Sequence, residues 1–158
     1  MATGKLPLEV ADWLTEHGWF PGRDIGQQAD ELIALRVQDS ERQYYPLAPV
    51  EAASKIIHSY GLLELGHPRL PARALVMDPT GRYEGDAAEI SELAANLGQR
   101  LFPVGYEASE LGLVLVDEGG RFFHLHHSGA YFIGSDENDA FSRFLSGADA
   151  PDAEDFFV

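Results

Sequence analysis

Apolar residues recur at helical spacing in five segments of the chain, the first of them just after Pro7. Glycines that suit the end of a helix follow four of these segments, at positions 18, 61, 98 and 147. The pattern therefore predicts five amphipathic helices. Their apolar stripes are Val10, Trp13, Leu14 and His17; Ile25, Ala29, Leu32 and Arg36; Val50, Ala53, Ile57 and Tyr60; Ile90, Leu93, Ala94 and Leu97; and Phe141, Phe144 and Leu145.

Capping residues predict where three of these helices begin. Asp24 with Gln27 three residues later forms a capping-box arrangement, so the second helix is expected to begin at Asp24. Asp86 is expected to cap the fourth helix and Ser135 the last. The segment from Ser40 to Leu47 is expected to be a loop.

The spacing of apolar residues changes from helical to strand-like in the second half of the chain. Short apolar runs lie at residues 74–77, 101–106, 111–117, 121–126 and 130–133, and Glu118-Gly119-Gly120 forms a turn between two of them. Successive short strands joined by tight turns pair antiparallel. Both alternate faces of residues 111–116 are apolar, which predicts a central strand covered by helices on both sides.

Together these elements predict an α+β fold with a mostly antiparallel central sheet covered by about five helices. Without an internal repeat or a long linker, residues 1–147 are expected to form a single domain. Residues 148–158 contain four acidic residues and are expected to form an acidic C-terminal tail.

Composition narrows the class of protein. Hydrophobic residues make up 45% of the 158 residues, which excludes disorder for most of the chain, and cysteine is absent, which excludes disulfides and thiolate chemistry. The first eight residues do not form a signal peptide, and no stretch reaches the roughly 18 apolar residues that a spanning helix needs. We therefore expect a soluble cytoplasmic protein without membrane contact.

The formal net charge of −15 concerns the partners of the protein. Such a charge repels nucleic acid and anionic lipid and attracts a basic protein, although it also serves solubility alone. Residues 1–65 carry five basic and ten acidic groups, and residues 66–158 carry six and sixteen. A basic partner is therefore expected to dock toward the sheet loops and the acidic tail.

Nucleic-acid binding is not expected, because arginines are spread singly and form no cluster that would neutralise phosphates. The opposite role is open to an acidic protein, which can occupy the basic groove of a nucleic-acid enzyme. The arginines are Arg23, Arg36, Arg42, Arg69, Arg73, Arg82, Arg100, Arg121 and Arg143.

The segment FFHLHH holds the one histidine cluster of the sequence. On a strand, His124 and His126 share a face beside Phe122, at a spacing compatible with two metal ligands, and His127 points the other way. The sequence places no third ligand beside them, and partly buried histidines satisfied by hydrogen bonds are the commoner arrangement. No metal or cofactor is therefore expected.

Catalytic motifs are also missing. The sequence contains no G-x-S-x-G, no phosphate-binding glycine loop and no EF-hand. Its paired carboxylates flank a turn or lie in the first turn of a helix, where negative charge is stabilising. We therefore predict that the protein is not an enzyme.

Several blocks, in order and over nearly the whole chain, resemble the SUKH superfamily of bacterial immunity proteins, and its third subfamily in particular. The blocks are GWFPGRDIG (residues 18–26), IIHSYGLLEL (56–65), LFPVGYE (101–107), LVLVDEGGRFFHL (113–125) and FSRFLSG in the last helix. The resemblance implies an α+β fold without catalysis that binds and neutralises a toxin encoded beside it in a polymorphic toxin system. One turn departs from the family, whose members tend to have two glycines after an aromatic residue, because this chain has Gly61 followed by Leu62.

The resemblance and the charge together predict a cognate protein toxin as the partner, basic and of the nuclease type. The alternatives are a regulatory or scaffold module of the same fold and a metal-dependent enzyme that uses His124 and His126. The oligomeric state is left open. The candidate partner-binding residues, each of which could instead be an ordinary solvated side chain, are Glu107, Glu110, Asp117, Glu118, Asp136, Glu137 and Asp139.

Overall fold

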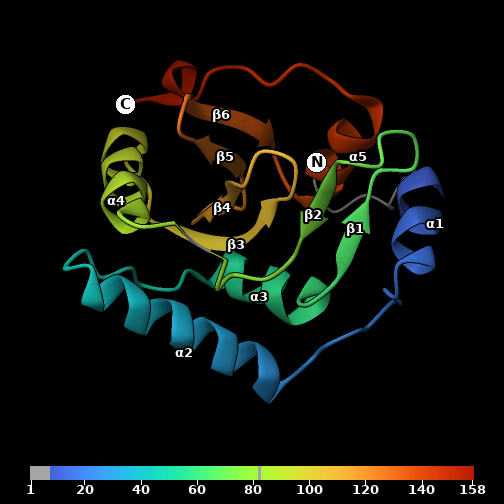
Figure 1. Cartoon of the computed structure of the whole chain (residues 1–158), viewed down its shortest axis with the longest axis horizontal. Coiled ribbons are helices and arrows are strands. Elements are labelled where there is room, and N and C mark those ends of the chain that lie inside the picture. Colours follow the sequence, from blue (N-terminus) through green and yellow to red (C-terminus); the bar gives the residue numbers. More distant parts are fainter. Residues whose placement is uncertain (1–7, 82) are drawn as a thin grey trace.

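The computed structural model describes residues 8–81 and 83–158, so that Pro7 and Arg82 lie outside the described residues. Five α-helices, one six-stranded antiparallel sheet and a short 3₁₀ helix account for the described part (Figure 1). The predicted α+β class is therefore confirmed. In chain order the elements are α1 (Leu8–Glu16), α2 (Gln27–Arg42), α3 (Glu51–Tyr60), β1 (Glu64–Gly66), β2 (Ala74–Val76), α4 (Asp86–Leu97), β3 (Leu101–Glu107), β4 (Gly112–Asp117), β5 (Phe122–His126), β6 (Gly129–Gly134), α5 (Glu137–Ser146) and η1 (Ala153–Phe156).

The sheet is a meander in which each strand pairs with its neighbour in sequence, in the order β1 to β6. Helices α4 and α5 lie on opposite sides of it (Figure 1). All six residues of β4 are buried, as expected for a central strand covered on both faces.

An aromatic cluster joins α1, α3 and α5 on one side of the sheet. The ring of Trp13 packs against Phe141 and Phe144, with centroids 5.9 and 5.7 Å apart. Tyr60 of α3 meets Phe141 edge-on at 5.1 Å and stacks on Trp19 at 5.8 Å. Each such pair contributes about 0.5–1.5 kcal/mol beyond the apolar area that it buries, so the cluster fixes these three helices to one another.

Helix α2 begins three residues later than the capping-box pattern predicts, and it ends later too. The Asp24 carboxylate accepts a hydrogen bond from the Gly26 amide (2.7 Å), and the helix starts only at Gln27. At the other end the helix continues to Arg42, and the Ser40 hydroxyl donates to the Val37 carbonyl (2.7 Å) and accepts from the Leu47 amide (2.9 Å) in the segment that follows. The segment expected to be a loop therefore begins as helix.

The sequence pattern did not indicate β1, and it misplaced the caps of α4 and α5. Strand β1 contains only three residues, too few to show a period. Gly85, not Asp86, is the N-cap of α4, and Asp86 is the first residue of the helix with its carboxylate bonded to Arg36. Asp136, not Ser135, caps α5: its side chain accepts from the Asp139 amide (2.8 Å).

The turn after α3 contains the family departure noted above. A Cβ on Gly61 would overlap the Ile57 carbonyl oxygen, so only glycine fits there. Leu62 has a φ of 68°, in the left-handed region that glycine favours, and its amide donates to the Met77 carbonyl (2.7 Å). The turn thus keeps a glycine-type backbone with a leucine in it.

Residues 148–158 run along the outer edge of the sheet. The Phe132 amide of β6 donates to the Pro151 carbonyl (2.8 Å), and Tyr131 pairs with Asp152. Phe156 of η1 stacks on Phe132 with a centroid separation of 4.5 Å. The acidic C-terminal segment is therefore held against β6, with its carboxylates exposed.

Candidate partner-binding surface

Two of the predicted acidic residues belong to the turn between β3 and β4. Glu107 is only 2% exposed, and its carboxylate accepts from the amides of Ala74, Ser109 and Glu110 at 3.0–3.3 Å. Burial by itself would raise the pKa of Glu107, but hydrogen bonds from the Ser109 hydroxyl and from these amides lower it below its usual range. Glu107 therefore stays charged and organises the turn, whereas Glu110 is exposed.

Two more acidic residues flank the β4–β5 hairpin. Asp117 is fully buried and accepts from the amides of Gly119 and Arg121 (both 2.9 Å) and from Arg121 Nε (2.7 Å). Glu118 is exposed and accepts from the amide of Arg100 (2.8 Å) and from its Nε (3.2 Å). The Arg100 amide holds the pKa of Glu118 below its usual range.

The last three lie at the start of α5. Asp136 is 9% exposed and caps the helix, and Asp139 accepts from the Ser135 amide (2.9 Å) and from Arg143 Nε (3.1 Å). Burial opposes ionisation of Asp139, but the hydrogen bonds from Ser135 and Arg143 give it a net lowered pKa. Glu137 is half-buried. Burial of the Tyr60 hydroxyl is the larger cause that raises the pKa of Tyr60 to about 12, and the nearby charge of Glu137 adds to it.

The structure places these seven residues in two groups at opposite ends of β4. Glu107 and Glu110 precede its first residue, while Asp117 and Glu118 end it, about 20 Å away at 3.3 Å per residue. Residues 136–139 lie at the second end, because Gly134 pairs with Phe122 of β5 and Phe122 pairs with Val116 of β4. No single end of β4 therefore carries all seven predicted residues.

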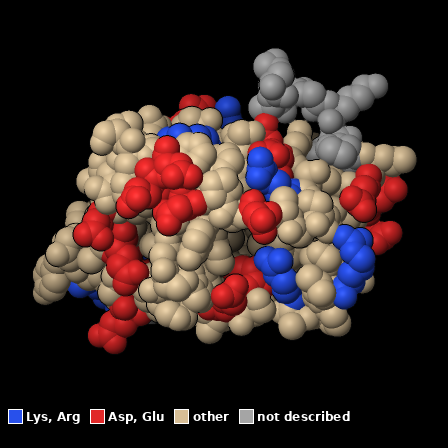
Figure 2. Space-filling model, turned by 90° about the horizontal axis from the view of Figure 1, so that it is seen from above, with Lys and Arg blue, Asp and Glu red and all other residues tan. Residues whose placement is uncertain are grey.

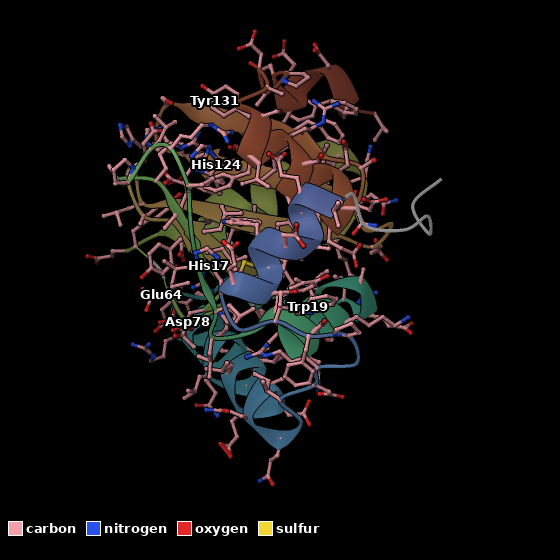
Figure 3. The ribbon with its side chains drawn as sticks, turned by 90° about the vertical axis from the view of Figure 1, so that its right-hand side faces the viewer. His17, Trp19, Glu64, Asp78, His124 and Tyr131 are labelled. Carbon is pink, nitrogen blue, oxygen red and sulfur yellow. The ribbon has the colours of Figure 1, made fainter. Side chains whose placement is uncertain are left out.

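The histidines of β5 are engaged within the fold. His124 lies opposite Tyr131 of β6, and Figure 3 labels the two on neighbouring strands. Its Nε2 is buried against Gly112 without a hydrogen-bond partner among the described residues, and burial lowers the pKa of His124. His126 Nδ1 lies 2.8 Å from the Ser128 hydroxyl, and its ring is 3.9 Å from that of His127.

The described residues contain no set of side chains that could bind a metal ion. The rings of His124 and His126 are 6.1 Å apart, and His126 Nε2 lies 3.5 Å from a Glu110 oxygen. Within residues 8–81 and 83–158, no three histidine, aspartate or glutamate side chains are grouped to hold a metal ion.

A cavity of about 130 Å³ lies between α5 and the sheet, with His124 in its wall. Arg73 enters it over the ring of Phe144, 4.9 Å from the centroid, and Arg143 lies over the ring of Phe132 at 5.6 Å. The space is close to that of an engineered apolar cavity that binds benzene. Its lining includes no serine, threonine, tyrosine or lysine, so it offers no hydroxyl or amine nucleophile.

Sequence reasoning missed a buried ion cluster between α2 and α4. Arg36 donates to Asp39 (3.1 Å) and to Asp86 (2.7 Å), and the side chain of Gln43 bridges the same two carboxylates at 2.8 and 3.1 Å. The signal available was an arginine within the apolar stripe of α2, which indicates a buried cation that needs acidic partners.

A second missed cluster joins α3 to α2 and to the loop before α2. His58 Nδ1 lies 2.6 Å from Asp24 Oδ1, and His58 Nε2 lies 2.9 Å from Asp30 Oδ1. The hydrogen bond with Asp24 raises the pKa of His58 and lowers that of Asp24. Since 34 residues separate the two, no local motif indicates the pair.

Figure 2 shows the face that carries β6 and the C-terminal segment, where Asp and Glu form several separate groups with fewer Lys and Arg among them. No helix in the described part of the chain combines the length and apolar character needed to cross a membrane.

A family model described as SUKH-3 immunity protein matches residues 6–147. No curated protein and no solved structure matches the chain.

Proposed function

The chain belongs to the SUKH-3 immunity protein family, and on this basis we propose that it neutralises a cognate protein toxin by binding it. The family match is the observation that carries the proposal, because it spans residues 6–147 and so includes the whole sheet and all five α-helices. We place the protein in the cytoplasm and in a polymorphic toxin system.

Binding, not catalysis, is the proposed mode of action. The described residues hold no metal cluster, and the cavity beside α5 has no serine, threonine, tyrosine or lysine in its wall. A protein that acts by occupying its target must be present in at least a one-to-one ratio. Protection is therefore expected to rise in proportion to the amount of this protein and to become complete only when it equals the toxin in amount.

The proposed toxin is basic, and a nuclease fits because its substrate groove is positively charged. A net charge of −15 attracts such a partner over distances beyond contact and raises the association rate at low salt. The seven acidic residues proposed as partner-binding all add to this field. Glu110 and Glu118 are exposed for direct contact, while Glu107, Asp117 and Asp136 act from inside the fold by holding their turns.

Coexpression with the toxin encoded beside the gene tests the proposal. The expected results are rescue of growth, a complex that survives purification at low ionic strength, and protection that saturates at a one-to-one ratio. Failure of rescue together with the absence of a complex at low salt would contradict it. Protection at a small fraction of the toxin concentration would indicate catalysis instead.

A further inference from the structure

Two adjacent tyrosines form the most exposed aromatic feature of the described surface. Tyr44 is 88% exposed and Tyr45 is 49% exposed, directly after α2. Figure 1 shows the end of α2 beside α4 at the rim of the molecule. Exposed tyrosines are among the residues that most often carry the binding energy of a protein interface.

Helix α4 supplies negative charge next to Tyr45. Tyr45 shares a shallow groove with Ala88, Glu89, Ser91 and Glu92 of α4. Glu89 and Glu92 lie three residues apart, on one face of the helix, and both are exposed. Aromatic rings beside carboxylates suit lysine and arginine, which stack on the ring and pair with the acid.

The corner between α2 and α4, with its two tyrosines, is held rigidly from beneath. Gln43 donates to Asp39 and Asp86 and accepts from the Ala87 amide (3.0 Å), which ties the end of α2 to the start of α4. The Tyr45 amide donates to the Ser40 carbonyl (3.1 Å). The buried ion cluster of Arg36 therefore fixes the backbone that carries the tyrosines, so that little backbone freedom is lost on binding.

Tyr44 is also kept in an unfavourable backbone conformation. Its φ of 65° lies in the left-handed region, which disfavours residues with a Cβ. The ring does not repay this cost by packing, because it is almost fully exposed.

We propose that Tyr44 and Tyr45, with Glu89 and Glu92 of α4, form the surface that anchors a basic segment of the cognate toxin. This inference rests on the proposed function. The surface lies at the N-terminal end of α4, where Asp86 meets Gln43, whereas Arg100 and Glu118 lie beyond the C-terminal end of this helix. The tyrosines supply the lasting contacts and the two glutamates supply charge complementarity.

Calorimetry and kinetic measurements with the purified toxin encoded beside the gene test the inference. Tyr44→Ala and Tyr45→Ala are each expected to raise the Kd at least tenfold, mainly through faster dissociation. The double variant Glu89→Gln/Glu92→Gln is expected to bind the toxin more slowly, with an association rate that depends less on salt. Leu70→Ala, which alters an exposed residue in the loop between β1 and β2, serves as the matched control and is expected to bind within twofold of the wild type.

A further variant separates binding from folding. Tyr44→Gly removes the ring and suits the positive φ, so its melting temperature is expected to equal or exceed that of the wild type while its affinity falls as in Tyr44→Ala. A purely structural role for Tyr44 would move both quantities together and would overturn the inference.

The rival location is the turn between β3 and β4, where Leu111 is 66% exposed beside Glu110. If Leu111→Ala with Glu110→Gln weakens binding tenfold while the tyrosine variants bind normally, the anchoring surface is wrong and the proposed function stands. If the wild type does not bind the toxin at low salt, both are overturned.

Discussion

Arg36 of α2 and Asp86 of α4 form an ion pair with both side chains fully buried, 50 residues apart in sequence, with Nη2 and Oδ2 separated by 2.7 Å. Asp39 and Gln43 complete the surroundings of the pair, and the Tyr83 amide donates to Asp86 as well (3.1 Å). The pair is the main polar link between the outer helix α2 and the helix that covers one face of the sheet.

Removal of one partner of this pair is expected to be strongly destabilising. Asp86→Ala leaves the Arg36 guanidinium buried with less compensation and is expected to cost about 3–5 kcal/mol in the free energy of unfolding, measured with urea. The control Arg42→Ala removes an exposed partner of Asp39 and is expected to cost less than about 1 kcal/mol. Equal losses in the two variants would contradict the prediction.

Leu62→Gly is expected to be more stable than Leu62→Ala, which also truncates a side chain that is 42% exposed. The left-handed φ of residue 62 costs alanine about 1–2 kcal/mol, whereas glycine loses about 0.5–1 kcal/mol in backbone entropy, so the glycine variant is expected to be the more stable by about 0.5 kcal/mol in urea unfolding. At Leu70, which lies outside the left-handed region, the glycine variant is expected to be the less stable of the two. The same order at residue 62 would argue against the strain.

The contact of His58 with Asp24 and Asp30 predicts a pH-dependent stability. The raised pKa of His58 gives a contribution that is fully present below the unfolded pKa of about 6.5 and is lost as pH rises through the folded pKa. The lowered pKa of Asp24 gives a contribution present above about 3.9 and lost as pH falls through its folded pKa. The wild type is therefore expected to exceed His58→Gln in stability most clearly between about pH 4 and 6.5.

Denaturant unfolding over a pH series, with NMR titration of the His58 ring, measures this effect. A difference between wild type and variant that grows above pH 7 would have the wrong sign.

Gly112 and His124 are expected to be coupled. A Cβ on Gly112 would overlap the imidazole of His124, so Gly112→Ala is expected to destabilise the protein by about 1–3 kcal/mol through overpacking. In a His124→Ala background the same change is expected to cost less than about 1 kcal/mol, which a double-mutant cycle of urea unfolding measures. Additive losses would show that the ring is not the obstacle.

Local sequence signals predicted a helix correctly where all of them lie within the segment that forms it. Helix α4 is the clearest case: the apolar stripe from Ile90 to Leu97, the acidic first turn and Gly98 all lie within one continuous segment. The start of α2 could not be predicted in this way, because Asp24 meets His58, which belongs to another helix.

The site was harder to predict than the fold, because an acidic residue looks the same in sequence whether it is buried or exposed. Asp117 and Glu118 are neighbours, yet one is fully buried in hydrogen bonds from Arg121 and the other faces solvent. The charge pattern drew attention to such carboxylates. The exposed Tyr44 gave no signal, since only its backbone angle and its exposure distinguish it from a tyrosine of the core.

The order of the strands has a consequence for how fast the molecule folds. Each strand of the meander pairs with the strand next to it in the chain, so the sheet can grow hairpin by hairpin, and only the passage through α4 between β2 and β3 requires a long loop to close. Chains dominated by such near-neighbour pairings fold faster than those that must first join distant segments. An inhibitor that has to be ready before its toxin is active gains from this topology, since its delay after synthesis is short.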